Sequence, residues 1–220
     1  MNKLISFLWL FFAIALSSTS TAEETISHSV AFPKGDAAWT IKLEKVAKEK
    51  SGEAAHQLVS IQSIDVVQKG DLRRDLTHWS DGSTSEAWWI PKLSIALMQS
   101  KLNGDIRGIK ISQLGPRRFD SSSFAWIGAQ NFQGIDTFKG RKVQRYTMES
   151  PLDDGTVAKY RAMIEEKSGT PVAVSDDVQL ALFAFDAALP KEPLILPSAF
   201  QEALRRYESY YAPAKKMGKR

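Results

Sequence analysis

Apolar and polar residues alternate along most of the chain, and this pattern predicts a β-rich protein. In AWTIKLEKV, residues 38–46, the apolar Trp39, Ile41 and Leu43 alternate with polar neighbours. A period of two is typical of a half-buried strand, because successive side chains point to opposite faces of a sheet. The same alternation in HQLVSIQSIDVVQKG, residues 56–70, predicts a second strand that is long enough to bend.

Turn residues join further alternating segments into hairpins. Residues 68–90 have the pattern of a strand, a turn and a second strand, in the sequence QKGDLRRDLTHWSDGSTSEAWWI. Asp81 and Gly82 stand in the turn. Three later segments predict a meander of antiparallel strands. They are FKGRKVQRYTMES, TVAKYRAMIEE and VAVSDDVQLALFAF, residues 138–150, 156–166 and 172–185. PKLSIALMQSKLNGD, residues 91–105, fits neither period, so we expect a short helix or an apolar loop there.

Helical spacing is confined to the C-terminal part of the chain. In LPSAFQEALRRYESYY, residues 196–211, apolar residues recur on one helical face, with Ser198 as the N-cap and Pro213 as the stop. The members of that face are Phe200, Ala203, Leu204 and Tyr207. The predicted fold class is therefore α+β: a strongly curved antiparallel sheet of about seven to ten strands with a C-terminal helix.

The first residues have the pattern of a secretory signal peptide over residues 1–22. A single Lys3 precedes an apolar run from Leu4 to Leu16, and the small residues Ser20 and Ala22 follow. That run is shorter than the ~20 residues of a membrane span, although an uncleaved anchor is the alternative. We expect a periplasmic or secreted protein with a flexible leader over residues 23–36. A single β-rich domain over 37–211 and a basic tail over 212–220 complete the predicted organisation.

Composition and charge exclude several classes of function. The chain has no Cys, which rules out thiol catalysis, thiolate zinc sites, iron–sulfur clusters and lipid attachment to Cys. A formal net charge of +4 does not indicate nucleic-acid binding. The tail APAKKMGKR concentrates positive charge, so it is either a solvated chain end or a contact for an anionic membrane surface.

No group of residues predicts catalysis. Asp75, His78 and Asp81 are of metal-binding type, but strand alternation places His78 on the face opposite to the two carboxylates. His28 and His56 stand in polar surroundings, where we expect them to be solvated. Paired acidic residues occur only near turns, and the glycines are dispersed. We therefore predict no catalytic residues, no metal, no cofactor and no enzymatic activity.

Aromatic residues are the candidates for ligand binding. They are Trp79, Trp88, Trp89, Trp126 and Phe124. The alternative is that these residues form the core of the sheet. Because Trp88 and Trp89 are adjacent on a strand, they must point to opposite faces, so both faces are covered there. Several arginines either ring a cavity mouth or protect sheet edges. They are Arg73, Arg74, Arg117, Arg118, Arg141 and Arg145.

The order of these segments resembles the LolA-like family of periplasmic lipoprotein carriers and sorting proteins. The resemblance covers roughly residues 37–185. It rests on WTIKLEKV, KGDLRRDLTHWSDGSTSEAWWI, FKGRKVQRYTM and AKYRAMIEEKSGTPVAV. It implies an antiparallel half-barrel around an apolar cavity. We therefore expect a non-enzymatic envelope protein that binds a lipid or lipoprotein acyl chain on the concave face. The alternative is a protein–protein interaction or scaffold module without an enclosed ligand.

Overall fold

The computed structural model describes residues 27–46, 59–114, 119–152 and 155–217, of which 212–217 are described as backbone alone. The predicted signal peptide and the start of the leader lie outside the described residues. No helix in this part of the chain is long and apolar enough to cross a membrane.

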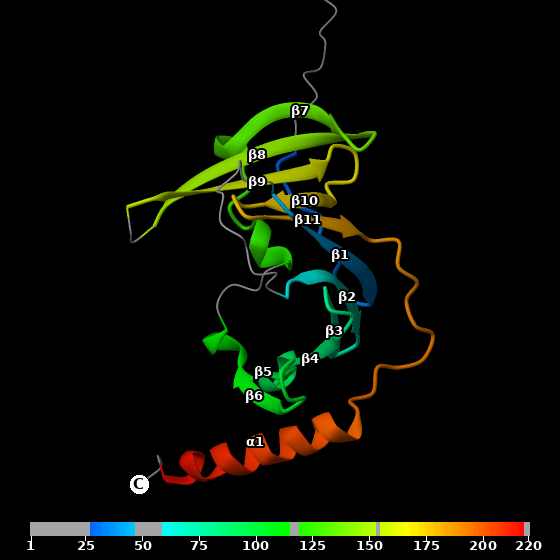
Figure 1. The fold of residues 1–220 in the computed structure, drawn as a ribbon, viewed down its shortest axis with the longest axis vertical. Coiled ribbons are helices and arrows are strands. Elements are labelled where there is room, and N and C mark those ends of the chain that lie inside the picture. Colours follow the sequence, from blue (N-terminus) through cyan, green and yellow to red (C-terminus); the bar gives the residue numbers. More distant parts are fainter. Residues whose placement is uncertain (1–26, 47–58, 115–118, 153–154, 218–220) are drawn as a thin grey trace, which may run out of the picture.

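The strands form one open antiparallel sheet of eleven strands, in the order β6-β5-β4-β3-β2-β1-β11-β10-β9-β8-β7 (Figure 1). The first six are β1 (Ala37–Lys45), β2 (Ile61–Lys69), β3 (Leu72–Trp79), β4 (Thr84–Ile90), β5 (Ile95–Gln99) and β6 (Ile106–Lys110). The others are β7 (Phe132–Phe138), β8 (Arg141–Pro151), β9 (Val157–Glu165), β10 (Pro171–Ser175) and β11 (Gln179–Ala184). The short 3₁₀ turns are η1 (Pro91–Leu93), η2 (Ile111–Gln113), η3 (Ser121–Phe124) and η4 (Ala129–Asn131). One α-helix, α1 (Ser198–Met217), follows the last strand.

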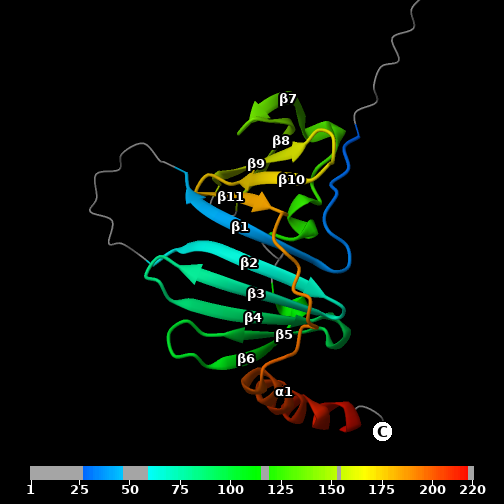
Figure 2. The same ribbon diagram turned by 90° about the vertical axis from the view of Figure 1, so that its right-hand side faces the viewer.

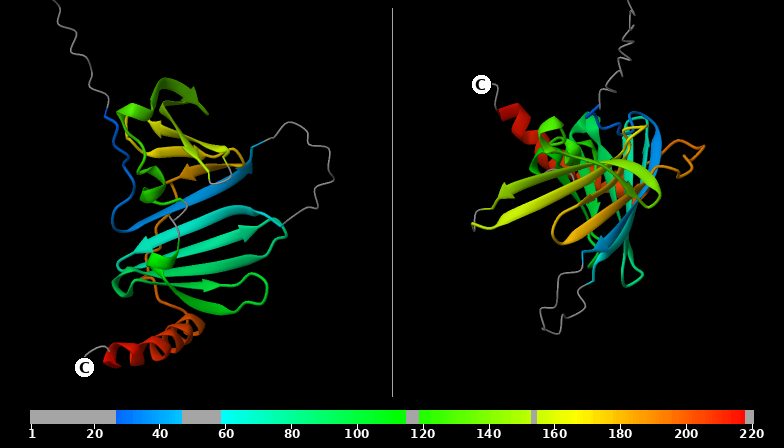
Figure 3. Two further views of the ribbon diagram at one scale, coloured as in Figure 1. Left: turned by 90° about the vertical axis from the view of Figure 1, so that its left-hand side faces the viewer. Right: turned by 90° about the horizontal axis from the view of Figure 1, so that it is seen from above.

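The sheet twists and bends into an open curve, which confirms the predicted fold class, although its eleven strands exceed the predicted seven to ten. Figure 1 shows the strands descending from β7 to β6 around a concave side that contains η3. Figure 2 faces the convex side, where residues 185–197 cross the sheet on their way to α1. Figure 3 adds the opposite view and the view from above.

The main core fills the central part of the concave face. Because opposite residues of paired strands share a face, Trp39, Ile41 and Phe183 point together from β1 and β11. They pack with Phe124, which lies on the segment that crosses the concave side. Aromatic rings dominate this cluster, and Phe183 contacts Phe124 with ring centroids 5.5 Å apart.

The described part of the predicted flexible leader, residues 27–36, is packed against this core. Phe32 contacts Trp39 with ring centroids 5.4 Å apart. The Ala31 N–H donates to the Gly169 carbonyl at 2.9 Å. His28, which the sequence predicts to be solvated, lies 3.0 Å from the Tyr146 hydroxyl through its Nδ1 atom and stacks edge-on with Phe132. That prediction was wrong for His28, because its polar sequence neighbours do not reveal the distant Tyr146. His56 lies outside the described residues.

A second core lies on the convex face between α1 and the last strands of the sheet. Trp88, Ile90, Ile95 and Leu97 pack against the helical face that the sequence predicts. The helix contributes Phe200, Ala203, Leu204 and Tyr207. The predicted amphipathic helix is therefore confirmed. It runs past Pro213 to Met217, so the predicted stop at that proline was wrong.

Two segments of the sheet differ from the sequence prediction. Residues 91–105 form η1, β5 and a tight turn rather than a helix or loop. Ala96 and Leu97 point to opposite faces and are both fully buried, so the strand lacks the polar alternation that identifies half-buried strands. Residues 172–185 form two strands, because Asp176 accepts hydrogen bonds from the Val178 and Gln179 N–H groups and closes a turn.

A candidate ligand pocket on the concave face

A pocket of about 450 Å³ opens between the concave face of the sheet and the segment that carries η3. The segment that carries η3 forms one side of the pocket, strands β8 to β11 form the floor, and residues of the β10–β11 turn complete the lining. The lining residues are Phe119, Ser122, Ser123, Trp126, Met148, Tyr160, Val174, Ser175, Asp176, Gln179 and Ala181. The volume lies in the range of ~300–1,000 Å³ that is usual for sites that bind small ligands.

The floor of the pocket follows directly from the strand register. Met148 on β8 lies opposite Tyr160 on β9, and Val174 on β10 lies opposite Ala181 on β11. Residues in opposite positions of an antiparallel pair point to the same face. Two directly opposed pairs therefore present methyl, thioether, phenol and isopropyl groups to one space.

The wall is held by local hydrogen bonds around η3. The Asp120 carboxylate caps this turn by accepting from the Ser122 N–H at 2.8 Å. Trp126 donates its indole N–H to the Ser123 carbonyl at 2.9 Å, and its own carbonyl accepts from the Asn131 amide at 2.5 Å. The Trp126 ring is thus fixed in orientation before any ligand arrives, which lowers the entropic cost of binding.

Phe119 introduces backbone strain into the same wall. Its φ of 77° lies in the left-handed region, which bulky residues rarely adopt. The Phe119 N–H donates to the Ser123 hydroxyl at 2.7 Å and holds this conformation. Strained backbone of this kind costs on the order of 1–3 kcal/mol and is concentrated at functional sites.

Part of the lining is polar. The β10–β11 turn contributes Ser175, Asp176 and Gln179. This turn is fastened to the neighbouring hairpin, because the Asp177 carboxylate accepts from the Lys159 N–H at 3.2 Å. A pocket lined by both apolar and polar groups suits a ligand with an apolar body and a polar end.

The structure separates the five aromatic residues that the sequence predicts as ligand-binding. Trp126 lines the pocket, and Phe124 is buried beside it in the concave core. Trp88 lies on the convex face beneath α1, with its ring centroid 6.1 Å from that of Phe200. Trp79 and Trp89 lie on the concave face but at the other half of the sheet, on β3 and β4.

Trp88 and Trp89 each donate a hydrogen bond to the carboxylate of an ion pair, one on either face of the sheet. The Trp89 indole N–H donates to Asp75 at 2.8 Å, and Asp75 also accepts from Arg73 at 2.7 Å. On the convex face, the Trp88 indole donates to Glu86 at 2.9 Å, and Glu86 accepts from Arg74 at 2.6 Å. Arg73 and Arg74 are therefore engaged in the sheet and do not ring the mouth of the pocket.

The three residues of metal-binding type have separate partners. Asp75 faces the concave side with Arg73, whereas His78 bonds Asp65 at 2.8 Å on the other face. Asp81 accepts from Lys101 at 2.7 Å in the β3–β4 turn. Among the described residues, no group of three or more His, Cys, Asp or Glu side chains could hold a metal ion.

The floor residues Met148, Tyr160, Val174 and Ala181 were missed by the sequence prediction. None of them is distinctive in type, and each lies on a different strand. The signal that could have found them is the register of the meander, which follows from the turn lengths once the β10–β11 turn is recognised.

Comparison with known proteins gives a distant match to a solved structure. No family model and no curated protein sequence matches the chain. Among solved structures, the chain is similar to the crystal structure of the Mycobacterium tuberculosis lipoprotein LppX. The sequence identity is 16%, the TM-score is 0.39, and the match covers 70% of this chain and 87% of LppX.

Proposed function

We propose that this protein is an exported, non-enzymatic envelope protein that binds a lipid or a lipoprotein acyl chain in its concave pocket. The observation that carries the proposal is the pocket itself, with its floor of Met148, Tyr160, Val174 and Ala181 and its wall of Phe119 and Trp126. The proposal includes a LolA-like mode of action, in which the curved sheet shields an apolar chain from water.

Burial of apolar surface supplies the driving force. Each methylene group that leaves water contributes about 0.8 kcal/mol, so a partly enclosed acyl chain gains several kcal/mol before the cost of ordering. The fixed orientation of Trp126 limits that cost on the protein side. The polar lining residues Ser175 and Gln179 offer partners for the polar end of the ligand.

A charge placed in the floor of the pocket tests this proposal. Val174 lies on the concave face and lines the pocket, whereas Leu182 on the adjacent strand points to the convex face and is similarly half-buried. We expect Val174→Glu to weaken binding of the fluorescent fatty acid cis-parinaric acid at least about tenfold, because a carboxylate beside an acyl chain must be desolvated.

Leu182→Glu is the matched control and is expected to bind the probe like the wild-type protein. Circular dichroism and thermal unfolding confirm that both variants are folded. Absence of probe binding by the wild-type protein, or equal binding by both variants, would contradict the proposed function.

Export belongs to the same proposal and is supported by the pattern of residues 1–22. Mass spectrometry of the mature protein is expected to show an N terminus at Glu23, after cleavage at Ala22. We also propose that the basic residues 212–220 contact anionic phospholipid, an interaction that weakens as salt is raised.

A further inference from the structure

The described lining of the pocket contains one charged residue, the acidic Asp176. It directly follows β10, and its side chain is half-buried. The other described lining residues are uncharged and carry apolar, aromatic, hydroxyl or amide groups. A ligand that enters the pocket therefore meets a carboxylate that no described lining residue neutralises.

The two carboxylate oxygens of Asp176 have different surroundings. Oδ1 closes the β10–β11 turn by accepting from the Val178 N–H at 2.8 Å and from the Gln179 N–H at 2.7 Å. Oδ2 has neither a hydrogen bond nor an ion pair to any residue that the structure describes. The turn needs a single acceptor oxygen, which an asparagine also supplies, so the second oxygen and the negative charge remain for a ligand.

The basic residues on the strands beside the pocket do not compensate this carboxylate. Lys159 and Arg161 flank the lining residue Tyr160 on β9, so strand alternation directs both to the opposite face of the sheet. Lys45 on β1 lies opposite Gln179 in the register, is exposed, and forms no ion pair with a described residue. The pocket therefore has a negative local charge, although the whole chain has a formal net charge of +4.

Three aromatic side chains, Phe119, Trp126 and Tyr160, line the same space. The face of an aromatic ring is partially negative and attracts a cation that lies within about 6 Å, and indole does so most strongly. Trp126 is already held in place by its hydrogen bond to the Ser123 carbonyl at 2.9 Å. The rings and the carboxylate therefore favour a positively charged ligand group and disfavour a negatively charged one.

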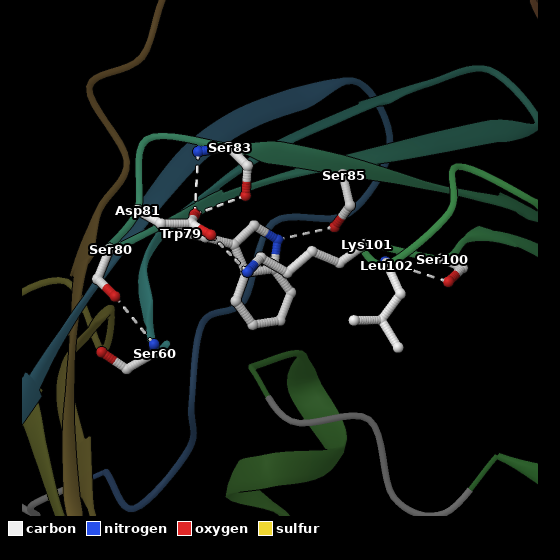
Figure 4. Close-up of polar contacts among 9 residues, drawn as sticks. All are labelled: Ser60, Trp79, Ser80, Asp81, Ser83, Ser85, Ser100, Lys101 and Leu102. Atoms are coloured by element: carbon white, nitrogen blue, oxygen red, sulfur yellow. Dashed lines mark hydrogen bonds and ion pairs between the residues drawn. The ribbon is translucent and has the colours of Figure 1, made fainter. Parts of the chain in front are cut away.

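The β3–β4 turn shows the same types of group with a cation in place. Asp81 closes that turn through Oδ1, as Asp176 does in the pocket. Its Oδ2 pairs with the Lys101 ammonium at 2.7 Å, and the same ammonium lies 5.1 Å from the centre of the Trp79 ring (Figure 4). Within this protein, a turn aspartate and a tryptophan thus hold an ammonium group. In the pocket, Asp176 and Trp126 offer groups of the same types to a ligand.

We propose that the pocket selects a lipid whose polar end carries an ammonium group, and that Asp176 recognises this group. The inference rests on the proposed function and adds the chemical class of the ligand. The apolar chain lies against the floor of the pocket, and the ammonium donates to Oδ2 of Asp176. A hydrogen bond between two charged groups is stronger than one between neutral groups, so it adds selectivity to the burial of the chain.

Three ligands with the same decyl chain test this inference. At neutral pH decylamine is a cation, decanol is uncharged and decanoate is an anion. Isothermal titration calorimetry measures their affinities for the full mature protein at low ionic strength. We expect decylamine to bind at least about tenfold more tightly than decanoate, with decanol between them, because the carboxylate attracts one end group and repels the other. This preference should weaken as salt is raised.

Asp176→Asn removes the charge and keeps the Oδ1 acceptor that closes the turn. We expect the preference for decylamine over decanoate to fall below about threefold, while decanol binds as before. The anionic probe cis-parinaric acid should bind this variant more tightly than the wild type. Asp177→Asn is the matched control, because Asp177 is adjacent and likewise half-buried but does not line the pocket. It makes the same change in net charge and should keep the wild-type preference.

The outcomes separate this inference from the proposed function. If the wild-type protein binds none of the three decyl ligands, the proposed function fails and the inference fails with it. If all three bind equally, or decanoate binds most tightly, the inference is overturned while the proposed function stands. An unchanged preference in Asp176→Asn, or an equal loss in Asp176→Asn and Asp177→Asn, also overturns the role of Asp176. The comparison of ligands on the wild-type protein decides the ligand class without any variant.

Discussion

At the scale of single residues, the sheet places two ion pairs back to back, one of them buried. Arg73 and Arg74 are neighbours on β3, so their side chains leave opposite faces and meet different carboxylates. The concave pair is the more enclosed, with the Arg73 side chain 7% exposed and that of Asp75 13% exposed. Breaking such a pair leaves an uncompensated charge in a site of low dielectric.

We predict that Asp75→Ala lowers the free energy of unfolding by about 3–5 kcal/mol, because Arg73 then stays buried without its carboxylate. Urea denaturation measures the change. The control is Glu44→Ala, which removes the partner of Lys42 on an exposed part of β1. Its expected loss is about 0–1 kcal/mol, so comparable losses in the two variants would refute the assignment of Arg73 and Asp75 as a buried pair.

Asp81 in the β3–β4 turn predicts a pH dependence. The hydrogen bond from the Lys101 ammonium, followed by those from the Ser83 hydroxyl and backbone N–H, holds the pKa of the Asp81 carboxyl well below its usual range. The unfolded chain takes up this proton near the ordinary pKa of about 3.9. The stabilisation is therefore fully present above about pH 4 and is lost as the pH falls towards the lower folded value.

Asp81→Asn is accordingly expected to unfold at a lower temperature than the wild-type protein at pH 7. The difference in melting temperature should shrink as the pH is lowered below about 4. The stabilisation that the ionised Asp81 carboxylate gives the folded state, and that the amide lacks, is then lost. Lys101→Met, which removes the main cause of the lowered pKa, should behave similarly. A difference in melting temperature that stays constant from pH 7 to pH 3 would show that Asp81 is not ionised in this network.

At the scale of elements, the half-buried strands could be predicted from the sequence and the fully buried strand could not. β1 and the β3–β4 hairpin show a clear alternation and a turn signal. β5 is covered by core on both faces, so its Ile95, Ala96 and Leu97 are all buried and carry no period. Tertiary coverage, which the local sequence does not encode, decides this case.

The docking of α1 depends on a glycine in the edge strand. A Cβ atom at Gly108 would lie 2.5 Å from Cδ2 and 2.8 Å from Cγ of Tyr207. We predict that Gly108→Ala pushes the helix away from β6 and lowers the free energy of unfolding by about 1–3 kcal/mol. Faster hydrogen exchange at the amides of α1 would accompany this loss.

A double-mutant cycle with Tyr207→Ala provides the control. Without the tyrosine ring, the two closest contacts of the added methyl group at Gly108 are removed and only the Cβ of residue 207 remains, at 3.0 Å, so the penalty should fall. An equal penalty in both backgrounds would mean that the helix does not rest on Gly108.

At the scale of the whole molecule, the curved sheet gives its two faces different properties. The convex face packs on α1, and the concave face holds the aromatic core and the pocket. Sequence alternation predicts two faces but does not say which face is concave. Of the predicted binding residues, only Trp126 lines the pocket, because the strand register and the path of residues 119–131 decide the lining.

Native mass spectrometry of the mature protein, purified from its own cell envelope, tests most directly whether the concave pocket carries an apolar ligand. We predict a monomer with one additional lipid-sized mass, which is released on collisional activation and is missing from Val174→Glu but retained by Leu182→Glu. A wild-type protein that carries no additional mass, or a bound mass that Val174→Glu retains in full, would contradict the proposal that this pocket binds a lipid or acyl chain.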